Sequence, residues 1–211
     1  MEVSVADAAD VLDVSPRRVR ALIGSGRVHA RLVAGVWLVD GATLPSGPRR
    51  SRSMSPANAW TLLTGSPAPA SRTAAARIRD QLRRLGQDAE PERLLASWVG
   101  SRADRRWFQS RDVDAVAADA RVVVSGLSDH RSAIAVGDLV EGYVLRDLLP
   151  ELRRDLLLRP GRPGSGNVLL HVADRELPRP VPPLVLAADL AEHDRPRELA
   201  RARELIREAL A

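Results

Sequence analysis

The sequence predicts an α+β protein with an N-terminal domain of two helices and a hairpin, a helical middle segment and a C-terminal mixed α/β domain. Beyond the hairpin, apolar residues recur at helical spacing up to residue 112. Short β-branched runs such as RVVVSG appear only after residue 112. A stretch rich in Pro, Ser, Gly and Arg, LPSGPRRSRSMSP, follows the hairpin and indicates a linker. These changes of composition define four segments, namely residues 1–44, 45–56, 57–112 and 113–211.

The first expected helix begins with an N-terminal capping signal. Ser4 can cap the helix, and Asp7 follows three residues later, which is a weak form of the capping box. One face of this helix is apolar and consists of Val5, Ala8, Ala9 and Leu12. We therefore expect it to pack against the rest of the N-terminal domain.

A second helix and a hairpin follow within the same domain. Ser15 caps again, Pro16 occupies the first helical position, and Gly26 is the expected stop. The inward side of this helix is formed by Val19, Leu22 and Ile23. The segments RVHARLV and VWLVD flank Ala34-Gly35, which predicts a tight hairpin. Helix, short turn, helix and hairpin in this order predict a winged helix-turn-helix.

Arginines gather on the two elements that touch DNA in such a fold. Arg17, Arg18 and Arg20 lie away from the apolar side of the second helix, and Arg27 and Arg31 alternate with His29 on the hairpin. The N-terminal part of a second helix enters the major groove, where arginine can bind guanine or phosphate. The candidate DNA-binding residues are Ser15, Arg17, Arg18, Arg20, Arg27 and Arg31.

The middle segment is expected to be helical and basic. We expect helices at about residues 57–63, 72–85 and 91–99, and we expect helical character to continue through 102–111. Arginines interleaved with Trp107 and Phe108 can form a nucleic-acid surface, but an amphipathic helix docked in the core explains them as well. Whether the segment Arg102 to Arg111 contacts DNA stays open at this point.

Residues 113–211 alternate between expected strands and helices. The strand candidates are RVVVSG, EGYVL, NVLLHVA and PPLVLAADL. The segment LRDLLPELRRDLLL predicts one or two short helices broken at Pro150, and a closing helix is expected from Asp194 to Leu210. The order of these elements predicts an α+β domain.

Charge is divided unevenly along the chain. All 32 basic residues are arginine, which by itself reports codon usage rather than function. Residues 1–112 have a net charge of +7, whereas residues 113–211 have a net charge of −2. A basic first half predicts contact with a polyanion, which is double-stranded DNA in this interpretation. The mildly acidic second half is better suited to a homodimer or a protein partner.

Composition argues against several classes of protein. The chain has no cysteine, which excludes disulfides and thiolate metal sites and favours a reducing cytoplasm. The longest apolar run, VPPLVLAA, is far shorter than the roughly 20 residues of a membrane-spanning helix, so no membrane contact is expected. No pattern in the sequence requires a cofactor.

Catalytic and metal-binding patterns are weak. Adjacent Ser128, Asp129 and His130 cannot align as nucleophile, base and orienting group, and GRPGSGN lacks the lysine of a phosphate-binding loop. The spacing of His171, Asp189, His193 and Asp194 matches no common zinc pattern, so surface or packing roles are expected for them. Glu176 and Glu192 form no recognisable acid–base pair. We therefore expect no enzyme.

Two resemblances extend this interpretation. Residues 3–40 resemble the winged helix-turn-helix of the MerR and excisionase group, with an Ala-rich first helix, VS, an Arg-rich second helix, GR and a wing that ends in WLV. In that group the second helix and the wing bind DNA, which implicates the six candidate residues and Trp37, although packing within the wing is the favoured role of Trp37. The segments NAWTLL, VSGLSDHRSAI, VEGYV, NVLLHVAD and LVLAADLAEHDRPRELARARELI resemble AbiEi-type antitoxins.

The second resemblance implies a transcriptional autorepressor with a nucleotidyltransferase-like toxin partner. The chain departs from that family in its excisionase-like wing and its basic helical insert. We therefore expect a sequence-specific DNA-binding regulator, with an antitoxin-like autorepressor as the leading hypothesis. An excisionase-like recombination accessory protein and a scaffold that does not bind DNA are the alternatives.

Overall fold

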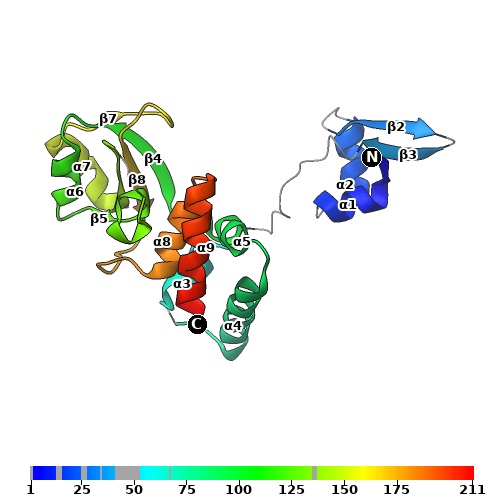
Figure 1. Cartoon of the computed structure of the whole chain (residues 1–211), viewed down its shortest axis with the longest axis horizontal. Helices are drawn as coiled ribbons and strands as arrows, with labels where there is room; N and C mark the ends of the chain where they lie inside the picture. The colour runs from blue at the N-terminus through cyan, green and yellow to red at the C-terminus, as the bar shows by residue number, and fades with distance from the viewer. Residues whose placement is uncertain are drawn as a thin grey trace. The chain divides into compact units, whose positions relative to one another are not determined.

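A computed structural model describes residues 2–12, 16–24, 28–33, 35–40, 53–66, 68–134 and 137–211. The chain divides into two compact units, Met1–Arg52 (unit 1) and Ser53–Ala211 (unit 2) (Figure 1). Each unit contains both helices and strands, so the α+β class is confirmed. The segments predicted separately at 57–112 and 113–211 lie in the same unit.

Unit 1 pairs two helices with a three-stranded antiparallel sheet. Its elements are β1 (Glu2–Ser4), α1 (Val5–Leu12), α2 (Pro16–Gly24), β2 (Ala30–Val33) and β3 (Val36–Asp40). The strand order is β1-β3-β2, and β2 and β3 form the expected hairpin, with Val33 opposite Val36. The buried residues of this small core are Val5, Ala8, Ala9, Val19, Val28 and Val39.

The capping box at the start of α1 is confirmed. The Ser4 hydroxyl accepts a hydrogen bond from the Asp7 backbone amide at 3.1 Å, and the Ser4 amide donates to the Asp7 carboxylate at 3.2 Å. The two residues thus satisfy backbone donors reciprocally at this helix end. The strand β1 was not expected, because its three residues are too few to show an alternating pattern.

Unit 2 has a cluster of five helices. They are α3 (Pro56–Thr64), α4 (Arg72–Gln87), α5 (Pro91–Val99), α8 (Pro183–Ala191) and α9 (Pro196–Leu210). Ser55 caps α3 by accepting a hydrogen bond from the Asn58 amide, and the Met54 amide donates to the Trp98 carbonyl at 2.8 Å. Residues 53–56 are therefore part of unit 2, and the predicted linker 45–56 was too long at its end; its residues 45–52 lie outside the described part.

A five-stranded sheet completes unit 2. It has the order β5-β6-β8-β4-β7 and consists of β4 (Asp104–Gln109), β5 (Val123–Val124), β6 (Val140–Leu145), β7 (Arg159–Pro160) and β8 (Val168–Ala173). β6 and β8 are parallel, and the other pairs are antiparallel. The short helices α6 (Val113–Ala118) and α7 (Leu149–Asp155) pack on one face, and α8 lies on the other.

The structure corrects the prediction of helix for residues 102–111. Residues 104–109 form β4, which pairs with β8 so that Phe108 lies opposite Val168 and is buried. The four charged residues near its start conceal the strand from local pattern, because pairing with a central strand, and not local propensity, determines its conformation. The description of 57–112 as helical is thus wrong from Asp104 to Gln109.

Two further predictions need correction. The segment PPLVLAADL is not a strand, because Pro183–Ala191 forms α8, in which every residue from Leu184 to Ala191 is buried. A helix that is buried on all sides has no polar face, so its sequence lacks helical periodicity. In addition, Pro150 lies in the first turn of α7 and begins that helix instead of breaking one.

Candidate functional site

The outer face of α2 carries arginines. Val19 is fully buried and Leu22 and Ile23 are half-buried against the core of unit 1, whereas Arg17 and Arg20 are exposed. The helix thus separates an apolar face from a basic one, as the spacing predicted. Arg18 belongs to α2, but the structure does not describe its side chain, and Ser15 and Arg27 lie outside the described residues.

The hairpin β2–β3 contributes a second exposed surface. His29 and Arg31 are both exposed, and Arg31 lies opposite Leu38 in the ladder. Trp37 is half-buried and packs against the core of unit 1, which confirms its expected packing role. The residues nearest the turn, Leu32, Val33 and Val36, are exposed apolar side chains.

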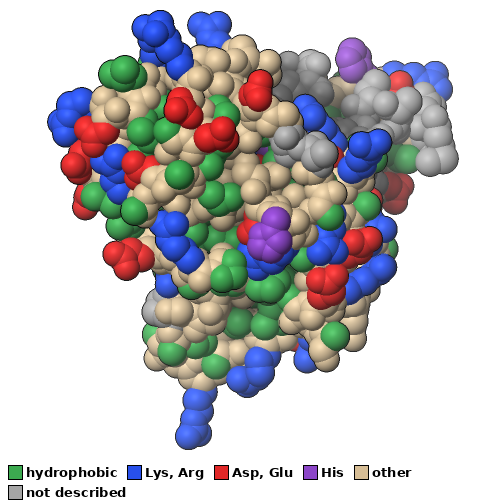
Figure 2. Space-filling view, turned by 60° about the vertical axis from the view of Figure 1, so that its left-hand side comes forward, with side chains coloured by type: hydrophobic (Ala, Val, Ile, Leu, Met, Phe, Trp, Pro, Cys, Tyr) green, Lys and Arg blue, Asp and Glu red, His purple; other side chains and the backbone are tan. Residues whose placement is uncertain are grey.

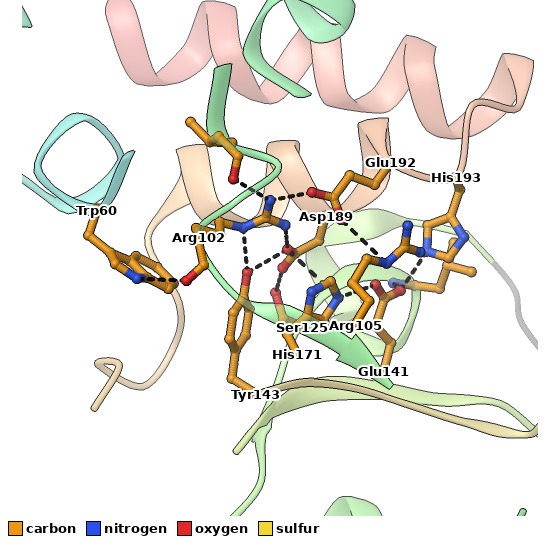
Figure 3. Close-up of polar contacts among 12 residues, drawn as sticks. Trp60, Arg102, Arg105, Ser125, Glu141, Tyr143, His171, Asp189, Glu192 and His193 are labelled. Atoms are coloured by element: carbon orange, nitrogen blue, oxygen red, sulfur yellow. Dashed lines mark hydrogen bonds and ion pairs between the residues drawn. The ribbon is translucent and has the colours of Figure 1, made fainter. Parts of the chain in front are cut away.

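A second concentration of functional groups lies inside unit 2, between the sheet and α8 (Figure 3). Alternation along β6 and β8 directs Val140, Val144 and the even-numbered residues of β8 toward α6 and α7. The opposite face therefore presents Glu141, Tyr143 and His171 to α8. All three side chains are buried, and the Tyr143 and His171 rings stack with centroids 4.8 Å apart.

Arg102 is the centre of this buried network. Its guanidinium forms ion pairs with Asp189 and Glu192 and donates to the Tyr143 hydroxyl at 2.9 Å and to the Val99 carbonyl at 3.2 Å. The Tyr143 hydroxyl in turn donates to Asp189 at 2.6 Å, and Ser125 donates to the second oxygen of Asp189. The Arg102 backbone carbonyl accepts the indole N–H of Trp60 at 3.1 Å, which connects the network to α3.

Glu141 forms the other half of the network. Its carboxylate oxygens lie 2.8 Å from Nε2 of His171 and 2.8 Å from Nε2 of His193, and it accepts the Leu127 amide at 2.9 Å. The close approach requires Gly126, which has φ of +54° and whose hydrogen faces the carboxylate; a Cβ atom there would overlap the carboxyl group.

The buried charges shift one another's pKa values. Burial alone raises the pKa of Glu141, but the hydrogen bonds from His171 and His193 outweigh it and lower the pKa to about 2. Burial also opposes protonation of His171, yet the charge of Asp189 and the bond to Glu141 raise its pKa above the usual value. The network therefore favours a protonated His171 between two carboxylates.

The arrangement is suited to fixing unit 2 rather than to presenting a reactive group to solvent. Arg102, Glu141, His171 and Asp189 are nearly or fully inaccessible. Within the described ranges, no cluster of three His, Asp or Glu side chains is arranged to hold a metal ion. The network bonds α3, β6, β8 and α8 to the turn that carries Arg102.

Of the four residues that sequence analysis weighed as ligands, three come together. His171, Asp189 and His193 belong to the network, whereas Asp194 is exposed and pairs with Arg93 at 2.8 Å. Ser128 accepts the Glu141 amide and donates to the Leu139 carbonyl, so it is not placed as a nucleophile beside His130.

Sequence reasoning missed Arg102, Glu141 and Tyr143 as partners. Arg102 lies 87 residues from Asp189 in the sequence, and its segment was interpreted either as a nucleic-acid surface or as a helix docked in the core. One signal was present, since a lone Asp189 in the apolar run LVLAADLA requires a buried partner once that run is recognised as a helix.

No family model matches the chain, and neither a curated protein nor a solved structure matches it. Among the described residues, no helix has the length and apolar character that spanning a membrane demands.

Proposed function

We propose that the chain is a sequence-specific DNA-binding regulator of transcription and that unit 1 is its winged helix-turn-helix. The observation that carries the proposal is the two-sided character of α2, with Val19 buried and Arg17 and Arg20 exposed. The hairpin β2–β3 follows α2 directly in the order of elements, as a wing does, and it exposes Arg31.

In this proposal α2 enters the major groove. A guanidinium can donate two hydrogen bonds to O6 and N7 of guanine, so Arg17, Arg18 and Arg20 are assigned to reading bases. Arg27 and Arg31 of the wing are assigned to backbone phosphates, which fix orientation but carry no sequence information. Ser15 precedes α2 in the sequence, and its hydroxyl is assigned to donating a hydrogen bond to a backbone phosphate.

We propose an antitoxin-like autorepressor as the biological setting, in which unit 2 binds a second copy or a nucleotidyltransferase-like toxin. The resemblance of residues 184–206 to the AbiEi-type antitoxins supports it. In unit 2 this segment forms α8 and α9, whose buried apolar faces build the helical core. An inverted repeat at the chain's own promoter would favour this setting, whereas direct repeats beside an attachment site would favour an excisionase-like accessory protein.

The test is a binding titration on a duplex selected from random sequence. Arg17→Ala and Arg20→Ala should each weaken binding by roughly 1–3 kcal/mol and relax specificity at one base pair. Arg31→Ala should weaken binding to all sequences alike. Arg197→Ala on α9 is the matched control, because it removes one exposed guanidinium from unit 2. Titrations in which none of the unit 1 variants differs from the control would overturn the proposal and leave the scaffold alternative.

A further inference from the structure

Positive charge in unit 2 is concentrated on α4. Residues 53–211 contain 24 arginines and 22 acidic residues, a net charge of +2. The helix α4 alone has five arginines and one aspartate, a net charge of +4, so the rest of the unit is net negative. In Figure 2 basic and acidic side chains are interspersed over the upper and middle parts of the molecule, and basic side chains project from its lower end.

Three of these arginines form one line along the helix. Arg79 and Arg83 follow Arg72 by seven and eleven residues. At about 100° per residue, all three point in nearly the same direction, and at 1.5 Å per residue they span about 16 Å. We call Arg72, Arg79 and Arg83 the α4 stripe; Arg77 and Arg84 lie on another face, about 120–140° around the helix from Arg72.

Most of this charge is not neutralised by the residues that the structure describes. Arg83 pairs with Asp80, and Arg84 lies over the Trp98 ring at 5.7 Å. Arg72 and Arg79 are exposed and form no side-chain hydrogen bond or ion pair with any residue in the described ranges. On α9, by comparison, Arg201 pairs with Glu204 and Glu208.

Helix stability does not explain the α4 stripe. Arg72 lies in the first turn, where the positive end of the helix dipole disfavours a cation, and that turn has no acidic residue. Leu85 is the only residue of α4 that is buried, with Ile78 and Leu82 packed partly against the core. The helix therefore contributes little to the core and lies at the margin of the helical cluster in Figure 1.

The chemistry of the outer face fits a polyanion better than a protein. Protein interfaces depend on apolar or aromatic anchors that fill pockets. The α4 stripe has only the small side chain of Ala76 between its arginines. Duplex DNA, in contrast, carries one negative charge for about every 1.7 Å of axis, so a line of about 16 Å spans several phosphates.

We propose that the α4 stripe binds the phosphodiester backbone of double-stranded DNA. This contact lies in unit 2, extends the DNA contact proposed for unit 1 and does not depend on it. It reads no sequence, because guanidinium–phosphate contacts position a protein without distinguishing bases.

The test measures the salt dependence of binding of the full chain to a duplex of random sequence. Arg72→Gln, Arg79→Gln and Arg83→Gln are combined in one variant. Since each phosphate contact contributes about 0.9 to the slope of log K against log salt, the slope should fall by about two to three. The control combines Arg195→Gln, Arg197→Gln and Arg207→Gln, which remove the same charge from exposed positions at α9. Its slope should change by less than about one.

Three outcomes would overturn the proposal. Equal losses in both variants would show an effect of net charge, and an unchanged slope in the α4 variant would exclude DNA contact there. A variant that binds DNA normally but fails to bind an acidic protein partner would reassign the surface to that class.

The test also separates this contact from the proposed function. If Arg17→Ala and Arg20→Ala leave binding unchanged while the α4 variant weakens it, the assignment of unit 1 fails and the α4 stripe stands. If the reverse is found, the α4 stripe fails and unit 1 stands.

Discussion

At the scale of single residues, the stability of unit 2 depends on the buried guanidinium of Arg102. It neutralises Asp189 and Glu192 in a place from which water is excluded. Such an arrangement stabilises only while every member is present, because an unpaired buried charge costs far more than the pair contributes.

We expect Arg102→Met to lower the free energy of unfolding by about 3–5 kcal/mol, because it leaves Asp189 without its cation. Urea unfolding measures the change. Combining Arg102→Met with Asp189→Leu should recover part of the loss, since the buried Asp189 carboxylate is then absent and Glu192 keeps its ion pair with Arg105 at 3.4 Å. A single variant as stable as the exposed control Arg79→Met would contradict the role assigned to Arg102.

The pH dependence of stability should reflect His171 and Glu141. His171 faces Glu141, Asp189 and Arg102, and its raised pKa means that the folded state holds a proton more tightly than the unfolded state. This contribution is complete below pH 6.5, the ordinary value for histidine, and is lost as the pH rises through the folded pKa. Glu141 acts in the opposite direction: its contribution is present above 4.5 and is lost as the pH falls toward about 2.

The unfolding free energy should therefore be greatest between pH 4.5 and pH 6.5, and it should decrease above pH 6.5. Urea unfolding across the range measures this in the wild type and in His171→Gln, which should lose the decrease on the alkaline side. The imidazole signals of the folded wild type give an independent measurement. A His171 signal that titrates below 6.5 would be inconsistent with the network.

At the scale of elements, Gly126 lets the backbone that follows β5 approach the Glu141 carboxylate of β6 closely. Gly126→Ala should destabilise unit 2 for two reasons. The added methyl group would displace the Glu141 carboxyl group, and the alanine would have to adopt a positive φ. Gly164→Ala is the matched control, since Gly164 also has a positive φ, +83°, but nothing lies near its Cβ position. Both should carry the backbone cost of roughly 1–2 kcal/mol, and only Gly126→Ala should exceed it and shift the His193 signal. Equal losses would mean that Glu141 moves freely.

Elements with their own local signal could be predicted from the sequence. The helices α1, α2 and α5 and the hairpin β2–β3 have caps, helical spacing or a Gly turn, and the structure has them where they were expected. The strand β4 and the helix α8 could not be predicted, because pairing with β8 and complete burial determine them. The buried network could not be predicted for the same reason, because its members are brought together by the fold and are far apart in the sequence.

At the scale of the whole molecule, the two units should behave as separate bodies. Residues 44–52 are rich in Pro, Ser, Gly and Arg, so limited proteolysis should first cleave there. The product that begins near Ser53 should unfold cooperatively and retain the raised pKa of His171. A first cut inside unit 2, or a product without a cooperative transition, would show that the units share one core.

In the proposed function, α2 reads bases in the major groove and the hairpin β2–β3 contacts the DNA backbone. Hydrogen exchange of the full chain, with and without a duplex selected for tight binding, tests it most directly. Exchange in residues 16–24 and 30–40 should slow on binding, and this protection should be lost at the same DNA concentration when Arg17→Ala is combined with Arg20→Ala. Protection confined to unit 2, or no duplex that binds even at low salt, would contradict DNA binding by unit 1.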